Sequence, residues 1–304
     1  MSRLYAALDL PLDWAREQDP VAPAPRLPVL ERLGARGDRA PASGDWRRWA
    51  LARVGLEAPE GDLPLGRLAA EAAGLAPDAA ASWLLATPVR LRASLTDIAL
   101  AALVPVPGEA QRQSLAARFN EAWRGTPYRL HALAHGFVLA SDEALSVETH
   151  DPEPLIGRSP PKATGPDAAR LRALGSEIEM WLHGEGGESG NALWLWGAGR
   201  APLAGEPRWP ALATPDAALA AARRVHPGPS QDARLERWSL GTLAGEADPL
   251  ASAERAWFRP LAAALARGQL REAELHLAGL SIHVRPGQRL RLWRRTRPWW
   301  ELAA

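Results

Sequence analysis

The spacing of apolar residues changes near residue 81 from a helical pattern to an alternating one. Upstream, Leu27, Leu30 and Leu33 recur at the interval of a helix face. Downstream, residues 88–93 alternate apolar side chains with arginines, as in a half-buried strand. A chain that mixes both periods is neither all-helical nor all-β, so the sequence predicts an α/β or α+β fold.

The order of these patterns predicts how the chain is organised. We expect a mainly helical region over residues 1–80, with residues 1–24 as an arm, and a mixed α/β domain over residues 81–304. The segment 152–165 is rich in Pro and Gly, so a split of the second region there is an open alternative. The alternation over 128–140 resembles a hairpin and favours a mixed sheet with flanking helices. Helices are expected at 27–36, 45–54, 64–73, 108–124, 167–183, 215–225 and 249–267, and strands at 83–86, 88–93, 96–103, 128–133, 136–140, 145–148, 192–196, 238–240 and 274–278.

Composition excludes several classes of chemistry. The absence of Cys removes disulfides, thiolate zinc sites, iron–sulfur clusters and cysteine nucleophiles. The formal charge of +1 gives no global attraction to polyanions. No signal-peptide pattern and no apolar run of membrane-spanning length is present, so a soluble, cytoplasmic protein without a membrane partner is predicted.

A glycine-rich stretch is the most site-like part of the chain. Residues 184–191 are followed by an apolar strand pattern and then by Gly197 and Gly199. Glycines at the end of a strand let backbone amides approach a phosphate. The pattern is not a dinucleotide fingerprint, and the only lysine, Lys162, lies elsewhere, so a P-loop is excluded. The alternative interpretation is a pair of tight turns around a buried strand.

The C-terminal segment combines arginine with tryptophan. The chain has 14 Trp but only 3 Phe and 2 Tyr. Arginines could neutralise phosphates while indoles stack on unpaired bases. The alternative is an arginine-studded element packed on an acidic surface. The candidate nucleic-acid contacts are Arg289, Arg291, Trp293, Arg294, Arg295, Arg297 and Trp299.

Five segments carry a resemblance to a known family. They are Leu27–Leu33, Ala86–Ala93, Ser176–His183, Asn191–Gly199 and Leu292–Pro298. With them the chain resembles the proteobacterial RpfE-type regulatory proteins, which are often labelled as predicted cofactor-independent phosphoglycerate mutases. The segment Asn191–Gly199 is also similar to part of the domain inserted in archaeal-type mutases. The resemblance implies a regulatory protein or a phosphate-transfer enzyme. The Asp/His set that two-metal phosphoryl transfer needs is not found in the sequence.

These observations favour a non-catalytic regulatory or ligand-binding protein. Its partner is unknown, with another protein or a small phosphorylated ligand as the candidates, and neither a metal nor a cofactor is expected. A mutase-like phosphate-transfer enzyme and a nucleic-acid-associated protein remain as alternatives, and no catalytic residue is identified. The expected ligand contacts are Glu177, His183, Asn191, Gly197 and Gly199.

Overall fold

The computed structural model divides the chain into two compact units. It describes residues 2–10, 26–53, 55–57, 60–76, 78, 80–93, 98–186, 190–199, 233–243 and 245–302. The described part of unit 1 lies within Met1–Leu56 and His226–Ala304, and that of unit 2 within Glu57–Ala204. Both units contain a sheet and helices, so the predicted mixed α/β class is confirmed.

Unit 1 is built on a five-stranded mixed sheet in the order β2-β10-β9-β1-β8. Its strand β1 runs parallel to its neighbours β8 and β9, whereas β10 runs antiparallel to β9 and β2. The strands are β1 (Ser2–Asp9), β2 (Asp38–Pro41), β8 (Ala233–Ser239), β9 (Leu270–Leu277) and β10 (Leu280–Val284). Ala278 and Gly279 join β9 to β10 with φ angles of 44° and 87°, as a two-residue hairpin turn requires.

The strand β1 corrects the expectation of an N-terminal arm for residues 2–9, while residues 11–25 lie outside the described residues. Residues Leu4 to Leu8 are all buried, because helices cover both faces of the sheet around them. A strand buried on both faces lacks the polar alternation that marks a half-buried one. The predicted mainly helical region over residues 1–80 therefore also contains an interior strand of a sheet.

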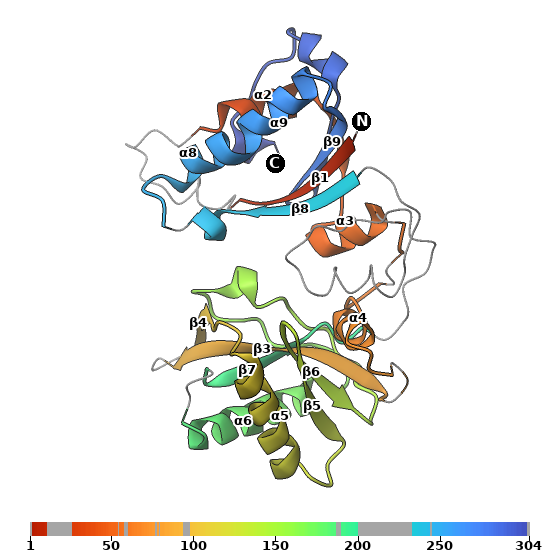
Figure 1. Ribbon diagram of the computed structural model, residues 1–304, viewed down its shortest axis with the longest axis vertical. Helices are drawn as coiled ribbons and strands as arrows, with labels where there is room; N and C mark the ends of the chain where they lie inside the picture. The colour runs from red at the N-terminus through yellow and green to blue at the C-terminus, as the bar shows by residue number, and fades with distance from the viewer. Residues whose placement is uncertain are drawn as a thin grey trace. The chain divides into compact units, whose positions relative to one another are not determined.

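Helices cover both faces of the unit 1 sheet (Figure 1). One face carries α2 (Pro28–Arg36), α8 (Pro249–Ala253) and α9 (Arg259–Ala266), and the other carries α3 (Trp46–Arg53). A π-helical turn, η4 (Glu254–Phe258), joins α8 to α9. The core between the sheet and α2, α8 and α9 is apolar and includes Leu30, Phe258 and Trp299.

Unit 2 contains an antiparallel sheet in the order β4-β3-β6-β5, with β7 also paired to β3. The strands are β3 (Ser82–Ala93), β4 (Ile98–Leu103), β5 (Tyr128–Leu133), β6 (Gly136–Ser141) and β7 (Ala192–Trp196). The two strands predicted at 83–86 and 88–93 form the single strand β3, which continues through Pro88. The predicted strand at 145–148 is reduced to one bridge between Glu148 and Thr164.

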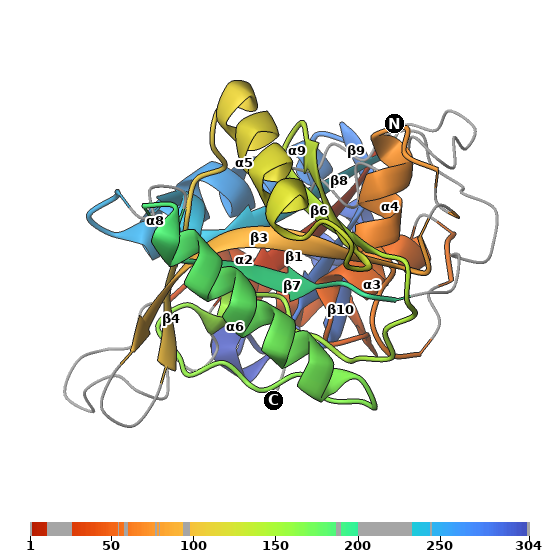
Figure 2. The same ribbon diagram turned by 90° about the horizontal axis from the view of Figure 1, so that it is seen from below.

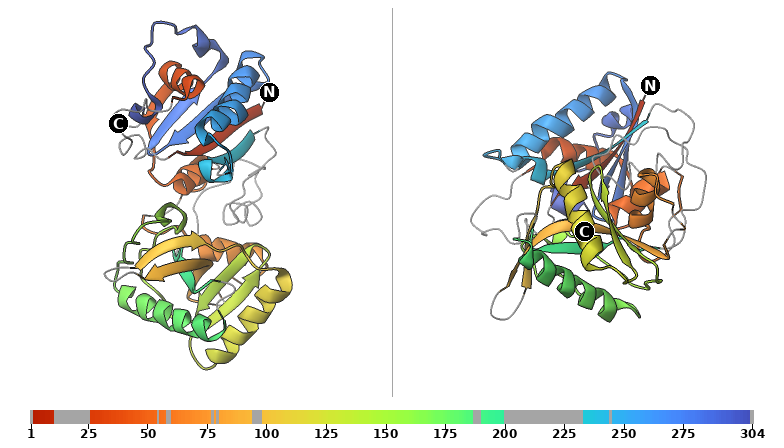
Figure 3. Two further views of the ribbon diagram at one scale, coloured as in Figure 1. Left: turned by 90° about the vertical axis from the view of Figure 1, so that its left-hand side faces the viewer. Right: turned by 60° about the horizontal axis from the view of Figure 1, so that its bottom comes forward.

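The helices α5 (Glu109–Ala122) and α6 (Ala168–Gly184) cover one face of this sheet (Figures 2 and 3). Three aromatic rings join them: Phe119 stacks on Trp123 at 4.2 Å, and Trp181 meets both rings edge-on. On the other face, α4 (Leu65–Ala72) lies directly against β3. A Cβ atom at Gly66 would lie 2.5 Å from the Trp83 carbonyl, so only glycine permits this approach.

The units divide the chain differently from the expected boundaries. The boundary expected at residue 80 lies between α4 and β3, both of which belong to unit 2. The segment 152–165 also lies wholly within unit 2. The helix predicted at 215–225 lies outside the described residues.

Candidate functional site

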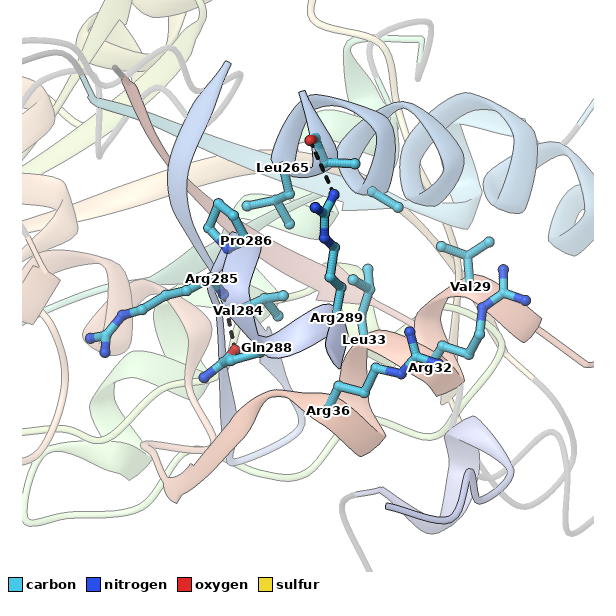
Figure 4. A pocket seen from close by; sticks show the side chains of 12 residues that line it. Val29, Arg32, Leu33, Arg36, Leu265, Val284, Arg285, Pro286, Gln288 and Arg289 are labelled. Carbon is cyan, nitrogen blue, oxygen red and sulfur yellow. Dashed lines mark hydrogen bonds between the residues drawn. The ribbon is translucent and has the colours of Figure 1, made fainter. Parts of the chain in front are cut away.

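A pocket of about 110 Å³ opens in unit 1 between α2, the end of α9 and the short helix η5 (Pro286–Leu290) (Figure 4). Its floor is apolar, and arginines surround the floor. The lining residues are Val29, Arg32, Leu33, Arg36, Ala262, Leu265, Ala266, Val284, Arg285, Pro286, Gln288 and Arg289. Among the described residues, the lining therefore contains four arginines and no acidic residue.

Three of these arginines face the pocket without an acidic partner among the described residues. Arg32 and Arg36 make no ion pair there, and Arg289 donates only to the carbonyl of Ala266, at 3.4 Å. Arg285 points away from the other three, toward Glu272 at 3.6 Å (Figure 4). An excess of positive charge beside an apolar floor is suited to a ligand with an anionic group and an apolar group.

The local sequence explains how the pocket forms. Arg32 and Arg36 are four residues apart and so lie on the same side of α2. Val29 and Leu33 occupy the adjacent stripe and form part of the floor. Arg32 and Arg36 are not among the residues predicted to form a site, although their i,i+4 spacing is visible in the sequence.

The arginine- and tryptophan-rich segment is fixed to the C-terminal end of α2. Arg291 donates to the carbonyl of Arg36 at 3.2 Å and forms an ion pair with Asp38. Arg294 donates to the carbonyl of Gly37 at 2.9 Å. These guanidinium groups complement the unpaired carbonyls at the end of a helix.

The predicted nucleic-acid residues therefore fall into different environments. Trp299 is completely buried in the core of unit 1, whereas Trp293 is 76% exposed. Arg289, Arg295 and Arg297 are exposed as well. Nucleic-acid binding by this segment remains a prediction.

Positive charge is concentrated around this segment. Arg39 donates to the carbonyl of Gly34 at 2.9 Å. Burial and the nearby charges of Arg297 and Arg294 lower the pKa of Arg39. Two distant parts of the chain thus place their arginines on one side of unit 1.

A second polar cluster lies under α3 and centres on Glu274 of β9, whose side chain is 2% exposed. It accepts hydrogen bonds from Trp49 at 3.2 Å, Arg53 at 2.8 Å and Ser281, and it pairs with His283 at 2.7 Å. Burial favours the neutral acid, but these donors outweigh it and lower the pKa of Glu274 to about 2. Its carboxylate is therefore fully coordinated by the protein itself.

His276 lies beside this cluster and is also buried. Its Nε2 atom lies 2.7 Å from the carbonyl oxygen of Ser43, which can only accept, so Nε2 carries the proton. Its Nδ1 atom is buried and has no hydrogen-bond partner among the described residues. Burial lowers the pKa of His276, which keeps the ring neutral. The ring packs against Trp49, with the two ring centroids 5.0 Å apart.

The glycines predicted to hold a ligand use their amides within unit 2. Gly197 donates to Oγ1 of Thr149 at 2.9 Å, and Gly199 donates to the carbonyl of Leu63 at 3.2 Å. Asp62 accepts from the amide of Thr149 at 2.9 Å, while burial raises the pKa of Asp62. These contacts correspond to the alternative interpretation of tight turns around a buried strand.

The other predicted ligand contacts do not share one environment. Asn191 pairs with Leu91 through both ends of its side-chain amide, at 2.7 and 2.8 Å, and so extends the pairing of β7 with β3. Glu177 and His183 lie on α6 with exposed side chains. A ligand site made from all five residues remains a prediction.

Two absences concern the described residues alone. Within them, no three His, Asp or Glu side chains are grouped so that they could hold a metal ion. No helix in the same part of the chain has the length and apolarity needed to cross a bilayer.

Comparison with known proteins gives limited similarity. No protein-family model matches the chain, and no curated protein sequence matches it. Among solved structures, a cofactor-independent phosphoglycerate mutase from Thermoplasma acidophilum is 14% identical, with a TM-score of 0.44 over 100% of this chain and 94% of that one. The PH0037 protein from Pyrococcus horikoshii is 13% identical, with a TM-score of 0.43 over 93% of this chain and 86% of that one. Similarity at this level identifies neither the fold nor the activity of this chain.

Proposed function

We propose that this chain is a ligand-binding protein that holds a small organic anion in the arginine pocket of unit 1. One observation carries the proposal: arginines surround an apolar floor, and no acid among the described residues lines the pocket. Guanidinium groups bind phosphate and carboxylate through paired hydrogen bonds. An unoccupied cluster of like charges repels itself, so an anion that enters relieves this repulsion.

The size and lining of the pocket define the class of ligand. A volume of about 110 Å³ is smaller than an enclosed cavity of roughly 150 Å³ that accommodates benzene. The floor formed by Leu33, Leu265 and Val284 therefore takes a short alkyl group. Arg32, Arg36 and Arg289 are placed to bind the anionic end. A phosphate monoester of a small alcohol has both parts.

Calorimetric titration of the full chain with n-butyl phosphate tests this proposal. We expect n-butyl phosphate to bind more tightly than inorganic phosphate or n-butanol, because each of these has only one of the two parts. Arg36→Gln should weaken binding by about tenfold or more, since a charge-assisted hydrogen bond contributes about 1.5–3 kcal/mol.

Arg259→Gln is the matched control, because Arg259 is an exposed arginine of α9 outside the pocket. This variant should bind like the parent chain. Equal binding by Arg36→Gln and the parent, or no binding of n-butyl phosphate at all, would contradict the proposal.

We further infer a regulatory rather than a catalytic role, in line with the resemblance to RpfE-type regulators. The alternative is the mutase activity that the family label implies. An assay for interconversion of phosphoglycerates, run with and without added divalent metal, separates the two. We expect no turnover under either condition. Metal-dependent turnover would favour the enzyme.

A further inference from the structure

The loop after η5 is held to the body of unit 1 by its polar residues. Just before the loop, Gln288 of η5 is buried, donates to Asp38 at 2.7 Å and accepts from the amide of Arg285. Arg291 and Arg294 bind the end of α2, as described above. At its far end Trp299 is buried in the core. The loop is thus fixed at both ends and in its middle.

The apolar side chains of this loop face the solvent instead of the body of unit 1. Leu290 is 67% exposed, Leu292 is 72% exposed and Trp293 is 76% exposed. These are three of the large exposed apolar side chains of the described residues, and they fall within four positions of the sequence. Because the neighbouring arginines are bonded to the protein, the loop cannot turn these side chains inward without breaking those bonds. Such a group indicates an interaction site.

Positive charge surrounds this apolar group. Arg289, Arg295 and Arg297 are exposed next to it, and no acid occurs from Arg289 to Trp300. Contrary to the expectation from the sequence of no membrane partner, we propose that the loop Leu290–Arg297 docks the protein on a membrane surface that contains anionic lipids. Leu290, Leu292 and Trp293 would enter the headgroup region, where tryptophan is favoured, and Arg295 and Arg297 would contact lipid phosphates.

The same residues fit single-stranded nucleic acid less well. Stacking on bases requires exposed aromatic rings, and leucine offers no π face. Trp299 is buried, and Trp300 is partly buried and packs edge-on against it at 5.7 Å. One exposed indole remains in the loop, so a nucleic acid would leave both exposed leucines unused.

Co-sedimentation of the full chain with vesicles tests the proposal. The vesicles contain phosphatidylcholine alone or phosphatidylcholine with about one third phosphatidylserine. We expect binding to the second kind only, and we expect it to weaken as salt is added. The double variant Arg295→Gln, Arg297→Gln should lower the partition coefficient by about 30-fold, because each arginine near an anionic surface contributes about fivefold and the two effects multiply. Neither arginine lines the pocket, so this result does not depend on the ligand proposed above.

The apolar contribution needs its own variant and control. Leu292→Ser with Trp293→Ser should lower the partition coefficient at least tenfold, roughly the effect of removing that apolar area. Ile156→Ser with Met180→Ser changes exposed apolar residues of unit 2 and should leave partitioning unchanged. Circular dichroism confirms that each variant is folded.

Three outcomes would overturn the proposal. The first is no binding to the anionic vesicles. The second is equal binding by the Leu292→Ser, Trp293→Ser variant and the parent chain. The third is binding of a single-stranded oligonucleotide that Trp293→Ser abolishes and Leu290→Ser does not, since that pattern would assign the loop to nucleic acid.

Discussion

Replacing Glu274 by alanine is expected to lower the free energy of unfolding of unit 1 by about 1–3 kcal/mol, because it leaves the buried Ser281 hydroxyl and the buried Trp49 indole N–H without an acceptor. Trp49, Arg53, Ser281 and His283 all bond to this carboxylate. Without it, the Arg53 charge and the Ser281 hydroxyl lose their acceptor under α3. Chemical denaturation followed by circular dichroism measures the change.

Glu272→Gln is the matched control for this variant. Glu272 lies on the same strand and pairs with Arg3 at 2.7 Å, but both side chains are partly exposed. A pair of this kind contributes about 0–1 kcal/mol. If Glu272→Gln lowers the free energy of unfolding as much as Glu274→Ala does, the Glu274 cluster has no special role in stability.

The low pKa of Glu274 also predicts how the free energy of unfolding depends on pH. Its folded value of about 2 lies below the ordinary value of 4.5, so its contribution to stability is present above pH 4.5 and is lost as the pH falls through about 2. The stability of the parent chain should therefore fall over this range more steeply than that of Glu274→Gln. Parallel curves for the two proteins would contradict the assignment.

Replacing Trp299 by alanine is expected to lower the free energy of unfolding by about 3–5 kcal/mol, which is the usual effect of removing a large aromatic side chain from a core. Trp299 is completely buried among the residues between the unit 1 sheet and α2, and its amide donates to Glu31 at 3.3 Å. The substitution leaves a cavity and loosens the C-terminal segment from α2. Denaturation with urea measures the loss.

The same segment supplies the control. Trp293→Ala removes an indole that is 76% exposed, and such surface substitutions change stability by no more than about 0.5 kcal/mol. A large loss of stability for Trp293→Ala would show that this indole is not on the surface. A small loss for Trp299→Ala would show that this indole is not part of the core.

Regular patterns made much of the fold predictable, and the exceptions have physical causes. The spacing of Leu115, Phe119 and Trp123 predicts the buried stripe along α5, which the structure confirms. The strand β1 was missed because both of its faces are buried, so it lacks alternation. The strand β10 was missed because only the two-residue turn at Ala278 and Gly279 separates it from β9, so the sequence shows no loop between the two strands.

The candidate site was less predictable, because it depends on contacts between distant residues. Arg289 was singled out from local composition, but Arg32 and Arg36 join it only through the packing of α2 beside α9 and η5. Composition also could not separate Trp293 from Trp299, since both lie in the same basic run. Only the tertiary packing decides which indole enters the core.

The pairing of β1 has a consequence for biosynthesis. Its partners β8 and β9 begin at Ala233 and Leu270, so more than 200 residues emerge from the ribosome before the first of them appears. At a translation rate of about 5–20 residues per second, β1 remains unpaired for on the order of 10–50 seconds. The described part of unit 2 ends at residue 199 and so is on the nascent chain before β8 appears, whereas unit 1 can close only near the end of translation. An apolar strand that stays unpaired for that time is exposed to aggregation during synthesis.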